Sequence, residues 1–371
     1  MKTLVMVLCM AGVALAQQRS KPPQEPPATD RAALGKTKKN KEDVDVSIKT
    51  GTEIAYDDNI LDLNDKQIKQ LQDGTGAPGK FKIDKPEDFV YSVWAEIKVK
   101  GRWIGDTTHA GLKVQPYFYM SNSIANYEEY EVYVRQDLGR NEAGLEYQLD
   151  RDAYLRELRH LVQQGGVTST PYDSARYLEH EVEAYYKHRL TEMIDLRGSA
   201  GYRLKDFDPT FDFRDLSGYF ISLGPILNLG SGFSAFLRYE FSDMSSGADP
   251  HVPFSSWTDP DTSYRQHEIQ IGGAVELLQK TFELSLKYRL QLREYTTNND
   301  AADDPDHVDR NDIRHKVSFK ARYKLSKSWS VRLEYTFWKV DSHRPFADES
   351  VTNEPGNSTR SVISIGATFV F

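Results

Sequence analysis

From Val44 onward the chain is dominated by segments in which apolar and polar residues alternate, the pattern of β-strands that have one apolar face. Residues 282–293 read FELSLKYRLQLR, with every even position apolar and every odd position polar. Residues 313–325, IRHKVSFKARYKL, alternate in the same way except at His315. Strands of soluble sheets usually run about five or six residues, whereas these run roughly 11 to 13, the length that a tilted strand needs to cross a bilayer.

The alternating segments predict an all-β protein, a transmembrane antiparallel up-and-down β-barrel of about fourteen strands. The strands are expected near 44–56, 89–100, 109–119, 127–137, 143–151, 176–190, 192–204, 218–227, 232–242, 263–275, 281–294, 313–325, 328–340 and 361–371. The count is least secure over 44–119, because the link at 57–88 is very long. A twelve-stranded barrel therefore stays open as an alternative.

The connections between these segments alternate between short and long. Bacterial barrels have short turns on the periplasmic side and long extracellular loops. The short connections are 190–193, 227–232, 276–281 and 325–328, and the long ones are 152–175, 205–217, 243–262, 295–312 and 341–360. A soluble sandwich has no reason to alternate in this way. The pattern places both the N- and the C-terminus in the periplasm.

The first residues predict where the protein is delivered. A short basic start, an apolar run over 4–13 and the small residues Ala14 and Ala16 are typical of a secretory signal peptide, which we assign to residues 1–16. Residues 17–43 are rich in Pro, Lys and Gln and are expected to form a flexible periplasmic tail, followed by the barrel at 44–371. The only cysteine, Cys9, lies inside the signal peptide, which excludes thiol catalysis and cysteine metal sites from the mature chain.

The last predicted strand carries a second signal. In the sequence SIGATFVF, Gly366 is followed by two aromatic residues on one face, Phe369 and Phe371. This arrangement resembles the C-terminal insertion signal of Gram-negative outer-membrane barrels. The resemblance implies delivery to the barrel assembly machinery and a location in the outer membrane, with membrane lipid as a partner.

A shorter resemblance lies at the end of the first strand. Residues 50–60 read TGTEIAYDDNI, and Tyr56-Asp57-Asp58-Asn59 followed by an apolar residue looks like the start of β-barrel porin families often found among surface-polysaccharide genes. The resemblance implies partners from a polysaccharide system.

Charged residues on the inward positions divide by sign. If large apolar residues face lipid, one group of strands points acidic side chains into the lumen and another group points basic side chains into it. The acidic set is Glu129, Glu131, Asp137, Glu146, Asp150, Glu179, Glu181 and Glu183. The basic set is Lys287, Arg289, Arg293, Arg314, Lys316, Lys320, Arg322 and Lys324. In a ring of fourteen strands these two sets lie on facing walls.

Two interpretations of the facing walls stay open. The first is a transverse electric field across a water-filled pore, which orients polar solutes and selects ions. The second is a plugged structural barrel, in which inward-folded loops or the walls themselves pair the charges. The formal net charge of −8 does not decide between them, because selectivity depends on local charges.

Two polar segments invite a comparison with metal sites. Loop 295–312 contains Asp300, Asp303, Asp304, Asp306, Asp309 and Asp312. It lacks the Gly and the terminal Glu of an EF-hand loop, so we expect a solvated acidic extracellular loop and no metal site. Residues 57–65 are similarly acidic, and 64–71 have the spacing of a short capped helix that folds over or into the mouth.

The positions of the histidines bear on whether the protein is an enzyme. His180, His267 and His315 fall on nominally lipid-facing positions near the outer strand ends, without an accompanying His-x-Ser pair. No phosphate loop, zinc spacing or nucleic-acid motif is present, so we predict no enzyme, no catalytic residue, no cofactor and no nucleic-acid partner. The function expected is a porin-like outer-membrane channel for small polar or anionic solutes. The alternative is a plugged interaction or export barrel of a surface-polysaccharide system.

Overall fold

A computed structural model describes residues 44–104, 106–159, 162–164, 167–169, 171–230, 232–247, 261–301, 304–347 and 356–371. The predicted signal peptide with Cys9, the predicted tail at 17–43 and Asp303 lie outside the described residues. The division of the chain at residues 16 and 43 therefore stays a prediction.

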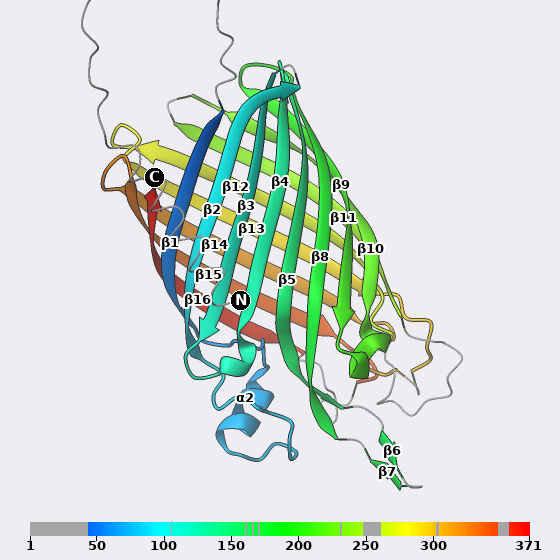
Figure 1. The fold of residues 1–371 in the computed structure, drawn as a ribbon. Coiled ribbons are helices and arrows are strands. Elements are labelled where there is room, and N and C mark those ends of the chain that lie inside the picture. Colours follow the sequence, from blue (N-terminus) through cyan, green and yellow to red (C-terminus); the bar gives the residue numbers. More distant parts are fainter. Residues whose placement is uncertain are drawn as a thin grey trace, which may run out of the picture.

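The described chain forms a closed barrel of fourteen antiparallel strands (Figure 1). They are β1 (Asp45–Asp57), β2 (Asp88–Ile104), β3 (Asp106–Tyr119), β4 (Tyr127–Leu138), β5 (Asn141–Arg159), β8 (Tyr172–Arg189), β9 (Ile194–Phe207), β10 (Leu216–Asn228), β11 (Phe233–Ser246), β12 (Tyr264–Leu277), β13 (Phe282–Tyr295), β14 (Asn311–Lys324), β15 (Trp329–His343) and β16 (Ser358–Val370). Each strand pairs with its neighbours along the chain, and β1 pairs with β16 to close the ring. The prediction of fourteen strands is confirmed, and the twelve-stranded alternative is wrong.

Short turns gather at one end of the barrel and long connections at the other, as predicted (Figure 1). The turn between β4 and β5 has only two residues, and Gly139 adopts a φ of 67° there, a left-handed conformation that glycine reaches without strain. The long connection between β5 and β8 carries a small hairpin, β6 (Val162–Gln164) with β7 (Val167–Ser169). We call the end with the long connections the loop end.

The two faces of the barrel wall differ in polarity. Large apolar side chains at alternate positions project outward, where the described residues leave them uncovered; Leu286, for example, is 56% exposed. The positions between them carry mostly polar and charged side chains, and several of these are buried, as in Glu268 and Gln270 on β12. A polar interior and an apolar outer band are the organisation of a transmembrane β-barrel.

Several inward-facing aromatic rings lie flat against glycines of the neighbouring strand. A Cβ atom added at Gly201 would approach the ring of Phe220 to 2.2 Å, so only glycine leaves room for the ring at this place. The same relation joins Trp94 with Gly51, Tyr133 with Gly111, Tyr185 with Gly144, and Phe236 with Gly272. Glycine within a strand often marks such a close approach. The rings thereby lie along the wall.

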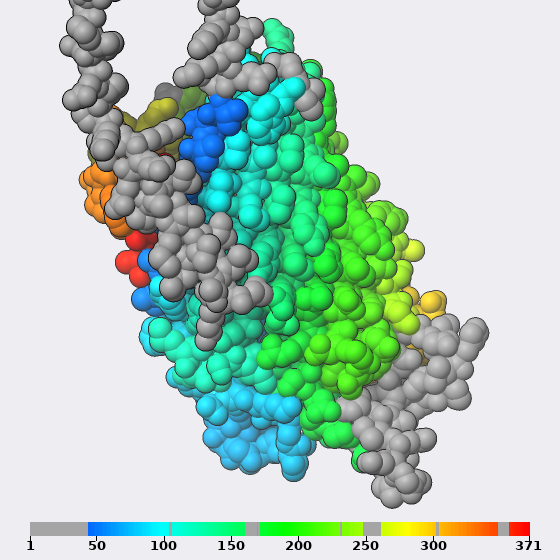
Figure 2. Space-filling model, viewed as in Figure 1, coloured from blue at the N-terminus to red at the C-terminus, as the bar shows by residue number. Residues whose placement is uncertain are grey.

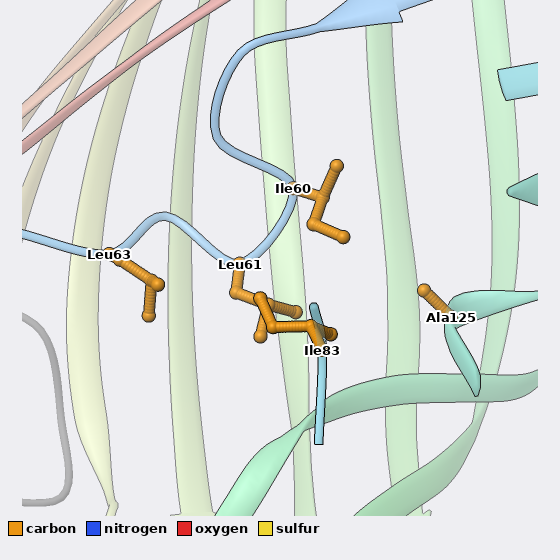
Figure 3. Packing of buried hydrophobic residues seen from close by; sticks show 5 residues of the cluster. All are labelled: Ile60, Leu61, Leu63, Ile83 and Ala125. Atoms are coloured by element: carbon orange, nitrogen blue, oxygen red, sulfur yellow. The ribbon is translucent and has the colours of Figure 1, made fainter. Parts of the chain in front are cut away.

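The connection between β1 and β2 folds into a compact unit at the loop end (Figure 2). Its helix α2 (Asp65–Gln72) is the one predicted, and it begins at a capping box in which the side chain of Asn64 accepts a hydrogen bond from the Gln67 N–H. The apolar side chains of Ile60, Leu61, Leu63, Ile83 and Ala125 pack beneath it (Figure 3). Ala125 belongs to the 3₁₀ turn η1 (Ser123–Ala125), so this small core ties the unit to the next loop.

The remaining helical segment is the 3₁₀ turn η2 (Pro209–Arg214), between β9 and β10. No helix among the described residues is long and apolar enough to cross a membrane.

Candidate functional site

The predicted acidic side chains share the inner face of adjacent strands. The β-sheet register sets Asp150 on β5 directly opposite both Glu129 on β4 and Glu179 on β8. Two inward positions further along β5, Glu146 lies opposite Glu183. Carboxylates placed opposite one another repel, so this wall needs cations to be stable.

Neighbouring strands supply those cations. On β9, Lys205 Nζ lies 2.9 Å from Glu179, and Arg203 lies 2.6 Å from Glu181. Further ion pairs join Arg197 to Glu183 at 3.3 Å and Lys113 to Glu129 at 3.1 Å. The ring of His109, which carries a charge only when protonated, lies 3.5 Å from Asp137. Arg197 also lies 3.9 Å from Glu146. Each of these partners occupies an inward position of the period-two pattern on β3 or β9, so the same pattern on those strands indicates it.

The predicted basic side chains also share one wall, on β13 and β14. Adjacent carboxylates pair with several of them: Arg289 lies 3.3 Å from Glu268, Lys320 lies 3.3 Å from Glu334, and Arg322 pairs with Glu283. Arg314 lies 2.9 Å from Asp312. Most charges of the acidic wall are therefore matched by the neighbouring strand, whereas on the basic wall Arg289, Lys320 and Arg322 are matched in this way and Arg314 pairs with Asp312 of its own strand.

A few charges lack such a partner. Among the described residues, no cation lies within ion-pair distance of Glu131 or Asp150, and no carboxylate lies within that distance of Lys287 or Lys316. Lys316 instead places its ammonium group 4.4 Å from the ring centre of Trp338. Because β13 and β14 stand opposite β4 and β5 in the ring, unmatched charges of opposite sign face each other across the interior.

A cavity of about 260 Å³ lies inside the loop end. Its described lining comes from five connections and from the strands β5, β8, β9, β10, β12, β13, β14, β15 and β16. Six of the lining side chains are cations: Arg156, Lys205, Arg214, Arg293, Arg310 and Arg314. Among the described residues, Asp62, from the connection between β1 and β2, is the only carboxylate in the lining. The cavity is thus strongly electropositive.

Three tyrosines of the lining each carry a cation on the ring. The guanidinium carbon of Arg293 lies 3.8 Å from the ring centre of Tyr264, and that of Arg310 lies 4.4 Å from Tyr295. Lys205 Nζ lies 4.7 Å from the ring centre of Tyr177. The negative face of an aromatic ring attracts a cation but carries no net charge. Lys205 and Arg310 also pair with the carboxylates of Glu179 and Asp312, whereas Arg293 has no carboxylate within ion-pair distance among the described residues.

Buried carboxylates behind the lining anchor two of the arginines. Asp312, 1% exposed, accepts hydrogen bonds from Arg310 Nε and Nη2 at 2.9 and 3.0 Å, and from Arg314 Nη2 at 2.9 Å. Asp304, 2% exposed, lies 2.7 Å from His307 Nδ1. The expectation of a solvated acidic loop is therefore wrong for Asp304 and Asp312, whose carboxylates are used to fold the loop. Among the described residues no cluster of His, Cys, Asp and Glu could hold a metal ion.

The three histidines singled out from the sequence lie on the outer face, each with a tyrosine. Nδ1 lies within 2.9 Å of a tyrosine hydroxyl in the pairs His180 with Tyr147, His267 with Tyr239, and His315 with Tyr288. In each pair the tyrosine stands two positions before the residue directly opposite the histidine, so the geometry is repeated three times. No serine or carboxylate completes a catalytic arrangement at these pairs in the described chain. That the protein is not an enzyme stays a prediction.

A closed antiparallel barrel with an apolar outer band and a charged interior has the architecture of Gram-negative outer-membrane barrels. No protein-family model and no curated protein matches the sequence. Among solved structures, the chain is similar to the anion-selective porin from Comamonas acidovorans, at 10% identity over 89% of this chain and 99% of that chain, with a TM-score of 0.41.

Two further solved structures have the same kind of likeness. One is the deltaS2 mutant of the TodX monoaromatic hydrocarbon channel (10% identity, 88% of this chain, 90% of that chain, TM-score 0.47). The other is a bacterial polysaccharide outer membrane secretin (9% identity, 87% of this chain, 98% of that chain, TM-score 0.39). At these identities the likeness concerns the barrel architecture alone.

Proposed function

We propose that this protein is a porin-like outer-membrane channel that passes small polar and anionic solutes. The observation that carries the proposal is the residual charge separation in the interior, with Lys287 and Lys316 unmatched on one side and Glu131 and Asp150 unmatched on the other. Unpaired charges on opposite sides of a ring are costly unless water and mobile ions reach them. A water-filled interior removes that cost.

The geometry supports a simple mechanism of passage. Paired charges along the walls give the solute a polar surface that replaces part of its hydration shell, while the unmatched charges set up a field across the pore. An anion travels along the side of β13 and β14, and a dipolar solute turns to align with the field. The electropositive cavity at the loop end raises the local concentration of anions at the entrance.

Ion selectivity in planar bilayers tests this proposal. In a KCl gradient, Lys287→Gln combined with Lys316→Gln should shift the reversal potential toward cations, and Glu131→Gln with Asp150→Asn should shift it toward anions. Both shifts should shrink at high salt, because the screening length falls to about 3 Å at 1 M. Charge reversal at a paired cation is a poorer test of selectivity, because the new Glu would lie beside its former carboxylate partner. The pairs concerned are Arg289 with Glu268, Lys320 with Glu334, and Arg322 with Glu283.

A matched control keeps the test specific. Lys339 lies on the outer face of β15, 2.8 Å from Asp341, and Lys339→Gln should leave the reversal potential unchanged. Open-channel steps with the same selectivity in both double variants would contradict the role of the unmatched charges. A folded barrel without any conductance would favour the plugged interaction or export barrel.

A further inference from the structure

We infer that the cavity at the loop end is a binding site for small carboxylates that carry a single ring. This inference rests on the proposed channel function, since it assigns to the channel a solute class and a place of capture. It is carried by the charge, the lining and the size of the cavity.

The charge of the lining calls for an anion. Six described cations line the cavity, and three of them also pair with a carboxylate behind the lining, Lys205 with Glu179 and both Arg310 and Arg314 with Asp312. Asp62, the one carboxylate of the described lining, lies 3.5 Å from Arg360. Arg293 is the clearest case. Its Nε and Nη2 donate to the Gln266 amide oxygen at 3.1 and 2.9 Å, its guanidinium lies on Tyr264, and among the described residues no carboxylate lies within ion-pair distance. A guanidinium without a carboxylate binds a solute carboxylate well, because its planar donors match the two oxygens.

The neighbours of Arg293 hold it ready for that role. Gln266 is 4% exposed and Tyr264 is 4% exposed, so both partners are themselves fixed by packing. The guanidinium is therefore confined between an amide and a ring, and little side-chain freedom is lost when a ligand binds.

The rest of the lining fits a ring. Leu155, Leu158, Phe207, Leu216 and Val340 contribute apolar surface beside the three tyrosines. A volume of about 260 Å³ lies near the lower end of the range of small-molecule sites, roughly 300 to 1,000 Å³, so the cavity has room for one ring with its substituents and not for an extended chain. An inorganic anion would use the cations but leave this apolar surface unfilled.

Equilibrium binding tests the site separately from conduction. The full-length protein in detergent is titrated with benzoate, benzamide, glucuronate and glucose, and heat release is measured by calorimetry. We expect benzoate and glucuronate to bind and their neutral counterparts to bind at least about tenfold more weakly, since each loses a charge-assisted pair. The two acids also show whether the ring that the site prefers is aromatic or a sugar.

An Arg-to-Gln substitution in the cavity and the same substitution outside it show where the carboxylate binds. Arg293→Gln should weaken carboxylate binding by about tenfold or more, and Arg293→Lys should restore part of it, because a point charge replaces the fork. Arg265→Gln is the matched control: Arg265 follows Tyr264 in the chain, but it lies on the outer face 3.4 Å from Asp243. Heat-modified migration on a gel verifies that each variant is folded.

The outcomes separate this inference from the proposed function. Equal binding of benzoate and benzamide, or unchanged binding in Arg293→Gln, would overturn the carboxylate site even if the barrel conducts ions. Displacement of both acids by millimolar chloride alone would also overturn it, since it would reveal a general anion atmosphere without a shaped site. Carboxylate binding by a barrel that shows no conductance would keep the site and overturn the channel.

Discussion

The middle of the barrel and its loop end use the same charged side chains but neutralise them in different ways. In the middle, a cation on one strand meets a carboxylate on the next, as Arg203 meets Glu181 and Arg289 meets Glu268. At the loop end, Arg293 lies on the ring of Tyr264 with no carboxylate within ion-pair distance among the described residues, and the carboxylate that anchors Arg310 and Arg314 is buried behind them.

The difference separates structural charge from functional charge. A pair on adjacent strands satisfies itself and leaves little for a solute. A cation held by a ring keeps its charge, and its attraction for an anion is undiminished. The loop end is therefore the region where the electrostatic attraction for a passing anion is strongest.

The largest loss of stability is expected at Asp312, the buried carboxylate that anchors two arginines of the cavity lining. Asp312→Asn leaves two arginines facing a neutral amide in a buried place, and breaking a buried pair in this way costs about 3–5 kcal/mol. The free energy of unfolding in urea, for refolded protein in lipid vesicles, measures the loss. Asp309→Asn is the control: Asp309 is exposed and has a φ of 53°, which Asn also adopts readily. Equal losses in the two variants would mean that Asp312 anchors nothing.

The next effect tests whether the middle of the barrel has water inside and lipid outside. Leu286→Arg puts a charge on the outer face and should cost about 2–4 kcal/mol at the bilayer midplane, whereas Lys287→Ser, one residue further on, should be tolerated. The same vesicle assay compares them. Because neighbouring residues of a strand point to opposite faces, similar losses would show that the faces are assigned one residue out of step.

The smallest expected effect is a pH dependence of local stability around Asp261. It belongs to the loop end alone and so distinguishes that region from the middle of the barrel. Burial alone would raise the pKa of Asp261, but hydrogen bonds from Ser263, Ser246 and Asn298 hold its pKa below the usual value. A carboxyl with a lowered folded-state pKa contributes stability above its unfolded pKa, near 4, and loses that contribution as the pH falls toward its folded pKa. The amides of Ser263 and Asn298 should therefore exchange hydrogen faster below about pH 4 than the pH change itself explains. In Asp261→Asn this extra acceleration should be absent.

The sequence was sufficient for the barrel because period-two alternation is imposed by lipid on one side and water on the other. The predicted strand 281–294 differs from β13 by one residue at each end, and 313–325 differs from β14 by two residues at the start and one at the end. The ends of the strands were harder to predict than their existence. The fifth strand was expected at 143–151 but runs from Asn141 to Arg159, because backbone pairing continues beyond the membrane where no alternation is required.

The cavity could be predicted only in part. Arg293 and Arg314 were recognised from their inward positions, and Lys205 follows the same rule on β9. Arg156, Arg310 and Asp62 lie at strand ends or in long connections, where no period indicates which way a side chain points. These three side chains reach the cavity through tertiary contacts, such as the hydrogen bond from Arg156 to the Leu61 carbonyl. Such contacts cannot be predicted from the pattern of a single sequence.

The pairing of β1 with β16 also dictates an order of events in time. Lys49 stands opposite Val370, and the seam is reinforced by Arg360, which binds the carboxylate of Asp57. Every other neighbouring pair of strands can form as soon as the second strand has been synthesised, whereas this seam joins the first strand made to the last. Until then β1 presents a row of unsatisfied backbone groups, the kind of edge that recruits stray strands. Closure of the ring is thus the strand pairing with the largest loop to close, because it joins the two strands that are furthest apart in the described barrel.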